Sequence, residues 1–303
     1  MQIGFAVPVS GPWATPENQA ALAREAEAAG YRSLWTLQRL ANPAASTDTT
    51  YRDVPDPLVT LGYLAALTGR IRLGVAIVNL PFVAPPLLAQ QAATLDRVSA
   101  GRLDLGLGIG WMPEEFAAAG VPMAGRGARA DEFVAVVREL WAHGTAEFHG
   151  RFYDFPPIAV GPAPVQRPGP PLLLGGTADA ALRRAGRIAD GWISSSRADL
   201  TAIGRSVGVV RDAAADAGRD PGALRFVCRG AVRVRDGAGG DRAPLTGSFD
   251  QIRDDFGRLA EQGVTELFVD LNFDPEITAP DADPRRSLDR ARTALAELAP
   301  DAG

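Results

Sequence analysis

The stretch that decides the fold is GRLDLGLGIGWMPEE, residues 101–115. Leucine alternates there with small or acidic residues, and a period of two places the leucines on one face of a strand. Glycine weakens a strand through its backbone entropy, so Gly106, Gly108 and Gly110 indicate a close approach to this backbone. The sequence predicts a buried strand, a glycine-lined turn and a helix. Either a flat ligand or a tight turn without a ligand accounts for the glycines.

The composition is that of a folded globular protein. Of its 303 residues, 46% are hydrophobic and 22% are charged, which are ordinary values for such proteins. The net charge of -5 at pH 7 gives no electrostatic reason to expect nucleic acid or a membrane surface as a partner. The 31 basic residues are all arginine, so chemistry that needs a lysine, such as a Schiff base, is excluded.

The cysteine and histidine content limits the chemistry further. Cys228 is the single cysteine, which rules out an intrachain disulfide or a CxxC pair. His143 and His149 are the two histidines, so we expect no metal site of the usual histidine-rich kind. The N-terminus enters a strand pattern at once, and no apolar run reaches membrane-spanning length. We therefore expect a cytoplasmic protein without a signal peptide or a membrane anchor.

Strand and helix patterns alternate along the chain. We expect strands at residues 2–7, 33–37, 71–78, within the opening stretch, and at 171–174, 191–194, 224–234 and 266–271. Helix patterns follow at 16–29, 57–68, 86–98, 128–142, 178–188, 200–217 and 250–262. Eight strands that each lead into a helix are the count of a TIM (β/α)8 barrel, and a doubly wound open sheet is the alternative.

The whole chain, residues 1–303, is predicted to form one barrel domain with insertions. Residues 146–170 break the alternation and are expected to form an insertion over the barrel, and about 275–303 are expected to form a C-terminal extension. Residues 38–57 are polar and irregular, which in a compact domain is typical of a functional loop or a lid.

Parallel strands place a site beyond their carboxyl ends, so the residues just after each strand are the candidates. They are Gln38, Arg39, Asn79, Gly110, Trp111, Met112, Gly175, Gly176, Thr177, Ser194, Ser195 and Ser196. A glycine-rich turn and a threonine at a helix start offer backbone and hydroxyl donors to a phosphate, and the serines add further donors. The alternative is a plain helix cap, because Asp179 already offers the helix dipole an anion.

The glycine run is not the dinucleotide-binding fingerprint, because Trp111 stands where that motif needs its third glycine. Trp111 either forms a face for a ring or only packs at the barrel rim. Arg39 either pairs with an anionic group of a ligand or forms a surface ion pair with Asp48 or Asp53.

Several motifs together resemble the bacterial luciferase-like monooxygenase family. Among them are GYRSLW at 30–35, IRLG at 71–74, SAGRLDLGLGIGW at 99–111, LGGT at 174–177 and ADGW at 189–192, with further matches at 3–8 and 89–96. The resemblance runs from residue 2 to about 274. Within the family it is greatest to the actinobacterial branch that uses coenzyme F420, a deazaflavin, in place of FMN.

The resemblance implies where a cofactor would lie. It implies a TIM barrel with the cofactor ring across its C-terminal mouth and the phosphate held by Gly175, Gly176, Thr177, Ser194 and Ser195. It also implies a non-proline cis peptide at Ala76–Ile77 behind the ring, Asn79 near the ring edge, and Gly108, Gly110, Trp111 and Met112 beside it. Relatives of this kind often form homodimers, so we expect one here.

One departure from the family concerns proton transfer. Gln38 and Arg39 stand where many deazaflavin-using relatives carry an Asp-His pair, and neither side chain titrates near neutral pH. Glu114 replaces an asparagine that several relatives carry. We therefore expect hydride transfer between the cofactor and a small organic substrate, with Gln38, Arg39 and Glu114 as candidate catalytic residues and Glu114 as the candidate acid.

Three alternatives remain open at the level of sequence. The first is an FMN-dependent monooxygenase of the same family, and the second is a flavin-binding protein without turnover. The third is a cofactor-free barrel hydrolase that uses Asp104, Glu114 or Asp270 as paired carboxylates. Against the third, we expect Asp104 to be a structural partner of an arginine inside the barrel.

Overall fold

Eight parallel strands close into a barrel in the computed structural model, which describes residues 1–47, 50–237, 239 and 241–300. The strands are β1 (Gln2–Ala6), β2 (Ser33–Thr36), β3 (Arg72–Asn79), β4 (Leu103–Gly108), β7 (Leu172–Gly175), β8 (Gly191–Ile193), β9 (Arg225–Ala231) and β12 (Glu266–Asp270). Their order around the barrel is β1-β12-β9-β8-β7-β4-β3-β2. Because β1 pairs with both β12 and β2, the sheet is closed. The predicted TIM barrel is confirmed, and the open sheet is excluded.

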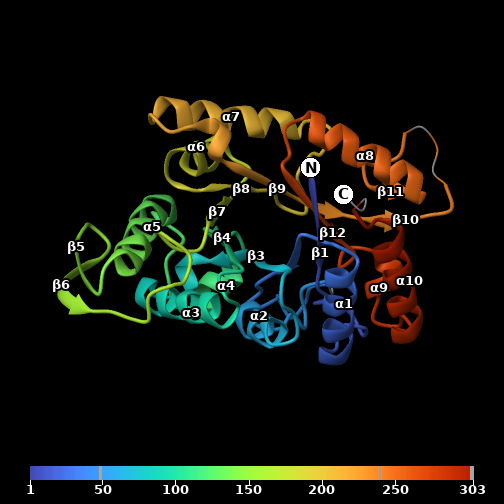
Figure 1. The fold of residues 1–303 in the computed structure, drawn as a ribbon, viewed down its shortest axis with the longest axis horizontal. Helices are drawn as coiled ribbons and strands as arrows, with labels where there is room; N and C mark the ends of the chain where they lie inside the picture. The colour runs from blue at the N-terminus through green and yellow to red at the C-terminus, as the bar shows by residue number, and fades with distance from the viewer. Residues whose placement is uncertain (48–49, 238, 240, 301–303) are drawn as a thin grey trace.

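Helices surround these strands (Figure 1). They are α1 (Pro16–Ala28), α2 (Pro57–Ala65), α3 (Pro85–Val98), α4 (Pro113–Ala118), α5 (Arg126–Ala142), α6 (Asp179–Ile188), α7 (Ile203–Asp216), α8 (Phe249–Glu261), α9 (Pro275–Thr278) and α10 (Pro284–Glu297), with short 3-10 turns at Leu80–Phe82 and Pro221–Ala223. The last helix, α10 in red, lies beside the first, α1 in blue, and an ion pair of 2.8 Å between Arg292 and Glu25 joins them. None of the described helices is long and apolar enough to cross a membrane.

Two small sheets lie outside the barrel. An antiparallel hairpin, β5 (Thr145–His149) and β6 (Asp154–Ala159), falls where the sequence predicts an insertion, and it projects beyond α5 at the edge of the molecule. The single strand predicted for residues 224–234 is wrong, because the structure divides it. The chain leaves the barrel after Ala231, and β10 (Arg233–Val234) pairs instead with β11 (Thr246–Gly247).

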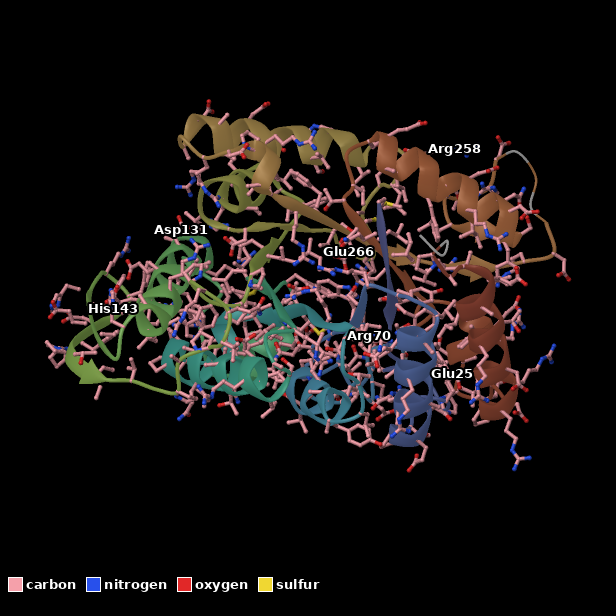
Figure 2. All side chains as sticks on the ribbon, in the orientation of Figure 1. Glu25, Arg70, Asp131, His143, Arg258 and Glu266 are labelled. Carbon is pink, nitrogen blue, oxygen red and sulfur yellow. The ribbon has the colours of Figure 1, made fainter. Side chains whose placement is uncertain are left out.

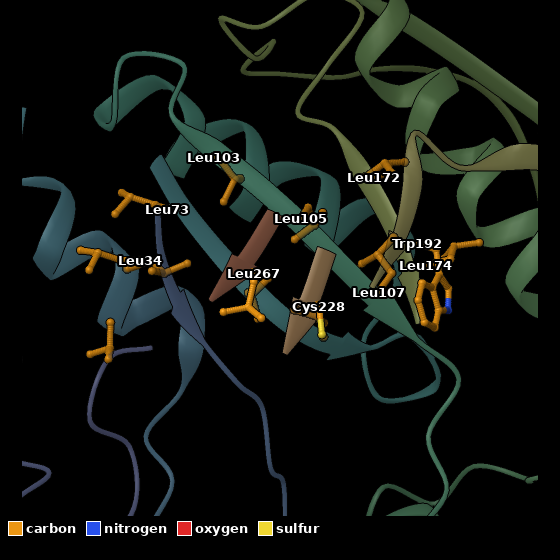
Figure 3. Packing of buried hydrophobic residues seen from close by; sticks show 14 of the residues in the cluster. Leu34, Leu73, Leu103, Leu105, Leu107, Leu172, Leu174, Trp192, Cys228 and Leu267 are labelled. Atoms are coloured by element: carbon orange, nitrogen blue, oxygen red, sulfur yellow. The ribbon is translucent and has the colours of Figure 1, made fainter. Parts of the chain in front are cut away.

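The opening stretch has the two faces that its alternation predicts. Leu103, Leu105 and Leu107 are fully buried in the core between strands and helices. Leu105 and Leu107 pair with Leu172 and Leu174 of the neighbouring strand, as Figure 3 shows. The opposite face of β4 points into the barrel. A smaller apolar cluster fills the barrel interior, and its members are Ala6, Trp35, Ala76, Leu173, Ile193, Val227 and Phe268.

An ionic network closes the end of the barrel where the strands begin. The fully buried Asp104 bonds to Arg72 at 2.6 Å and to Arg225 at 2.7 Å, and Arg225 also bonds to Glu266 at 2.7 Å. Burial opposes ionisation of Asp104, but the hydrogen bonds and charges of the two arginines outweigh it and hold the pKa of Asp104 below its usual range. Glu266, the other acid of the network, lies near the middle of the molecule in Figure 2. Because Asp104 is buried and paired with two arginines, its role is structural, as predicted.

Candidate functional site

A cavity of about 730 Å³ opens at the carboxyl ends of the barrel strands. Its volume is typical of sites that enclose a small molecule or cofactor. Most of the residues predicted from the sequence line it, namely Gln38, Arg39, Ala76, Ile77, Asn79, Gly108, Gly110, Trp111, Gly175, Gly176, Thr177, Ser194, Ser195 and Ser196. Met112 and Glu114 do not line it, and neither do Asp104 and Asp270. The barrel therefore brings predicted residues from the ends of five strands, β2, β3, β4, β7 and β8, to one place.

The structure does not bring Met112 and Glu114 to the described cavity lining. Met112 is the N-cap of α4 and is only 5% exposed. Glu114 is exposed in the first turn of α4, whereas its neighbour Glu115 is fully buried. Consecutive helical residues point about 100° apart, so only one of the two glutamates can face the barrel. The candidate acid Glu114 thus faces solvent.

Glu115 holds the start of the long loop after β2. Its carboxylate accepts a hydrogen bond from Arg39 Nη1 at 2.8 Å and one from the backbone N–H of Leu40 at 2.7 Å. The Arg39 guanidinium also lies 4.4 Å from the centre of the Tyr51 ring and 5.1 Å from that of Trp111. The ion pair of Arg39 is thus with Glu115 rather than Asp53, and Asp48 lies outside the described residues. Neither Glu115 nor Tyr51 was identified from the sequence, because no local motif marks them.

The end of β3 has the irregularity that the resemblance implies. The peptide bond Ala76–Ile77 is cis, and the pairing of β3 with β4 shifts register between Val75 and Val78. Gln38 fixes the end of this bulge, since its Oε1 accepts a hydrogen bond of 2.8 Å from the backbone N–H of Asn79. Gln38 is therefore a positioning residue for the cavity wall.

The glycines of β4 make room for this bulge. A Cβ at Gly106 would lie 2.2 Å from the carbonyl oxygen of Val75, and a Cβ at Gly108 would lie 2.5 Å from Ile77 Cδ1. The close approach predicted at these glycines is thus made by β3 itself. Only Gly108 lines the cavity in addition, so the two glycines have different roles.

Hydrogen-bond donors gather at the other end of the cavity, where β7 leads into α6. Gly176 has a φ of +145°, and a Cβ there would lie 2.5 Å from that of Ala181, so this position needs glycine. Ala178 cannot cap α6 with a side chain, which leaves the helix N-terminus to a ligand. The hydroxyl of Ser194 is less available than predicted, because its O–H donates to Cys228 Sγ at 3.8 Å while its oxygen accepts a 2.9 Å bond from the N–H of Arg229. The N-terminus of α7 also faces the cavity through Ile203.

The charged side chains around the cavity are mainly positive. The described lining contains Arg39, Arg197, Arg205 and Arg229 and one carboxylate, Asp199. Glu115 pairs with Arg39, and Asp179 pairs with Arg205 at 2.9 Å. Hydrogen bonds from Thr201 hold the pKa of the exposed Asp199 below its usual range, so it stays ionised at neutral pH. The excess of arginines over carboxylates in the cavity lining favours an anionic ligand.

Arg229 also lines the cavity, although the sequence did not identify it. It shares the inward face of β9 with Val227, two residues earlier. The described lining contains no histidine, and no described group of three or more His, Cys, Asp or Glu residues is arranged to hold a metal ion. The mainly positive lining therefore suits an anionic molecule.

Comparison with known sequences gives a family. A model described as luciferase-like monooxygenase matches residues 2–239. An uncharacterised protein of Mycobacterium tuberculosis is 35% identical over 293 residues, covering 91% of this chain and 92% of that protein. An FMNH2-dependent dimethylsulfone monooxygenase of Pseudomonas putida is 34% identical over 161 residues, covering 52% of this chain and 44% of that protein.

Solved structures agree with this assignment. Monooxygenase RslO1 from Streptomyces bottropensis has a TM-score of 0.82 at 26% identity, with 98% of each chain covered. The coenzyme F420-dependent tetrahydromethanopterin reductase from Methanopyrus kandleri shares the fold, with a TM-score of 0.78 at 17% identity and coverage of 99% and 100%. With the closed barrel and the match over most of its length, the chain belongs to the luciferase-like monooxygenase family of oxidoreductases.

Proposed function

We propose that the protein is an oxidoreductase that transfers a hydride between coenzyme F420 and a small organic substrate. The observation that supports this most is the division of one cavity into two parts. One part is a wall formed by the bulge of β3 and by Gly108, and the other is a donor-rich end between β7 and α6. A deazaflavin cofactor has two matching parts, because its planar ring suits the wall and the phosphate on its flexible chain suits the donor-rich end.

The residues present fit such a cofactor. Ala76, Ile77 and Gly108 would hold the ring, with Asn79 at its edge, and the turn of Gly175, Gly176 and Thr177 would hold the phosphate together with Ser195. Buried nitrogens without a hydrogen-bond partner among the described residues, Arg39 Nε and Arg229 Nε, are consistent with a missing anionic ligand. When bound, a deazaflavin supplies a ring carbon that accepts or donates a hydride.

The protein's own residues position the reactants and limit access of water. Gln38 fixes the bulge of β3 through Asn79, and Arg39, stacked between Tyr51 and Trp111, covers the mouth next to Glu115. We propose Gln38 and Arg39 as orienting residues rather than proton donors. Because the lining residues that the structure describes include no histidine and one carboxylate, Asp199, the proton of the substrate would exchange with solvent.

An FMN-dependent monooxygenase is the second candidate. It is favoured by the likeness to the dimethylsulfone monooxygenase and to the Streptomyces monooxygenase. Titration of the protein with oxidised and reduced F420 and FMN, followed by fluorescence, separates the candidates. Tight binding of F420 with hydride transfer supports the proposal, and binding of FMN alone with oxygen consumption supports the second candidate. If F420 and FMN each bind only at millimolar concentration or more weakly, both candidate functions are contradicted.

A protein that binds the cofactor without turning over a substrate is a separate outcome. Stopped-flow mixing of the reduced complex with carbonyl and enone acceptors tests for it by measuring the rate of cofactor oxidation. Oxidation of the cofactor by an acceptor faster than by buffer supports an enzyme, and equal rates with every acceptor support a carrier of the cofactor.

We further propose that the protein works in the cytoplasm as a homodimer. The outer faces of α2 and α3 expose Val59 at 74%, Tyr63 at 43%, Leu87 at 49% and Val98 at 61%. Apolar surface of this kind is commonly covered in a symmetric assembly. Sedimentation equilibrium should give twice the chain mass, and Val59→Glu should shift it to the monomer. A monomeric wild type at micromolar concentration would contradict the dimer.

A further inference from the structure

Arg229 is a buried cation on the floor of the cavity. Its side chain is 7% exposed although arginine is seldom buried. One terminal nitrogen, Nη2, donates a hydrogen bond to the carbonyl oxygen of Ala76, the first residue of the cis peptide. The guanidinium carbon lies 5.5 Å from the centre of the Phe268 ring and 5.6 Å from that of Phe273. The side chain is therefore fixed against the wall that the β3 bulge forms.

The charge of Arg229 is only partly compensated. The nearest carboxylate oxygen, Asp270 Oδ2, lies 3.7 Å from Nε, beyond hydrogen-bond distance. The other oxygen, Oδ1, accepts hydrogen bonds from the backbone and side chain of Asn272. Complete burial raises the pKa of Asp270, although Arg229 opposes the shift. Among the described residues Nε has no hydrogen-bond partner, so the guanidinium retains capacity for an anion.

The other charged groups around the cavity do not cancel this charge. Arg39 and Arg205 are paired with acids outside the cavity lining, and Arg197 and Asp199 are both exposed on the loop after β8. Arg39 is as buried as Arg229, but Glu115 neutralises it at 2.8 Å. A buried charge is screened by solvent much less than the exposed charges of Arg197 and Asp199 are. Among the described lining residues, Arg229 is therefore the buried cation that lacks a hydrogen-bonded carboxylate.

We propose that Arg229 stabilises negative charge on the ring of the bound cofactor. This inference rests on the proposed function, which lays the ring against Ala76 and Ile77. The ring hydroxyl of F420 ionises to an anion whose charge spreads over the ring, and reduction of FMN by two electrons and one proton also leaves one negative charge on its ring. A cation beside the ring favours both anions over their neutral forms. Arg229 would thereby supply charge stabilisation where the site lacks an acid.

The test is a pH titration of F420 bound to the full chain, followed by the absorption of the ring anion. In the wild type the pKa of the bound ring hydroxyl should lie below that of free F420. Arg229→Gln, which removes the charge and keeps a donor for Ala76, should raise it by about one unit or more. Arg229→Lys should stay near the wild type. Arg258→Gln, at the periphery in Figure 2, removes an equal charge far from the cavity and should change nothing.

FMN gives a second readout. The ratio of the affinities for dithionite-reduced and oxidised FMN should fall about tenfold in Arg229→Gln and stay constant in Arg258→Gln. An unchanged pKa and an unchanged ratio in Arg229→Gln, with the cofactor still bound, would overturn the inference alone. Failure of the wild type to bind either cofactor would overturn the proposed function as well. If Arg229→Gln does not fold, a wild-type pKa equal to that of free F420 still refutes the inference.

Discussion

A methyl group added at Gly108 should weaken cofactor binding more than it weakens the fold. The new Cβ would lie 2.5 Å from Cδ1 and 3.0 Å from Cγ1 of Ile77, and both residues line the cavity. Because Cδ1 is the end of a flexible side chain, Ile77 can move at a cost of about 0.5–1.5 kcal/mol. The methyl group and the displaced side chain then take space from the wall proposed to hold the ring.

Gly106→Ala is the matched control on the same strand. Its Cβ would lie 2.2 Å from the carbonyl oxygen of Val75, which is backbone and cannot rotate away, and Gly106 does not line the cavity. Overpacking of this kind costs about 1–3 kcal/mol or more. Gly106→Ala should therefore lose more unfolding free energy than Gly108→Ala, and its folded fraction should lose less affinity for the cofactor, because the added methyl group takes no space from the cavity.

The two variants are compared by urea unfolding and by fluorescence titration with the cofactor. Gly108→Ala should bind the cofactor at least about tenfold more weakly than the wild type, equivalent to about 1.4 kcal/mol. Its loss of unfolding free energy should be smaller than that of Gly106→Ala. Gly108→Leu should abolish binding and remain soluble. Wild-type affinity in Gly108→Ala, or an equal loss of affinity in folded Gly106→Ala, would refute the assignment of this wall.

Three further variants and one control variant, Glu114→Gln, test the rest of the site and the barrel. Glu115→Gln should lower the unfolding free energy by about 3 kcal/mol, because it leaves Arg39 buried without its partner, whereas Glu114→Gln should change it by less than about 0.5 kcal/mol; equal urea midpoints would contradict this. The ionised form of Asp104 stabilises the fold at pH above its unfolded pKa of about 4, and this contribution is lost as the pH falls through the lower folded pKa. Asp104→Asn should thus cost about 3–5 kcal/mol at pH 7 and progressively less in acid, and a constant difference across pH would be the contrary result. Thr177→Val should weaken binding of the phosphorylated cofactor about fivefold and leave that of its phosphate-free form unchanged; equal losses would remove Thr177 from the phosphate site.

Much of the barrel could be predicted because its signals are local. The alternation at Leu103, Leu105 and Leu107 is that of a strand packed on one face, and the structure buries all three. Thr15 caps α1 through the N–H of Asn18, with Pro16 in the first turn, as the residue types indicate. The division of residues 224–234 could not be predicted, because pairing with β11 depends on residues that follow later in the chain.

Residues of the cavity lining could be predicted where the lining depends on the backbone, and less readily where it depends on side-chain direction. The glycine-rich turn at Gly175 and Gly176 can be recognised from the sequence alone, because the two glycines are adjacent and directly follow a strand pattern. The choice between Glu114 and Glu115 depends on where α4 begins, and helix boundaries shift by one or two residues for reasons outside the local sequence. Arg229 lies within a strand pattern, where an inward arginine cannot be distinguished from a surface one until the neighbouring strands are placed.

A crystal structure of the protein with its cofactor tests the central claim most directly. The account predicts the ring against Ala76, Ile77 and Gly108, and the phosphate within about 3 Å of Thr177 Oγ1 and of the N–H groups at the start of α6. A phosphate bound elsewhere, or a ring outside the cavity that these residues line, would contradict the account.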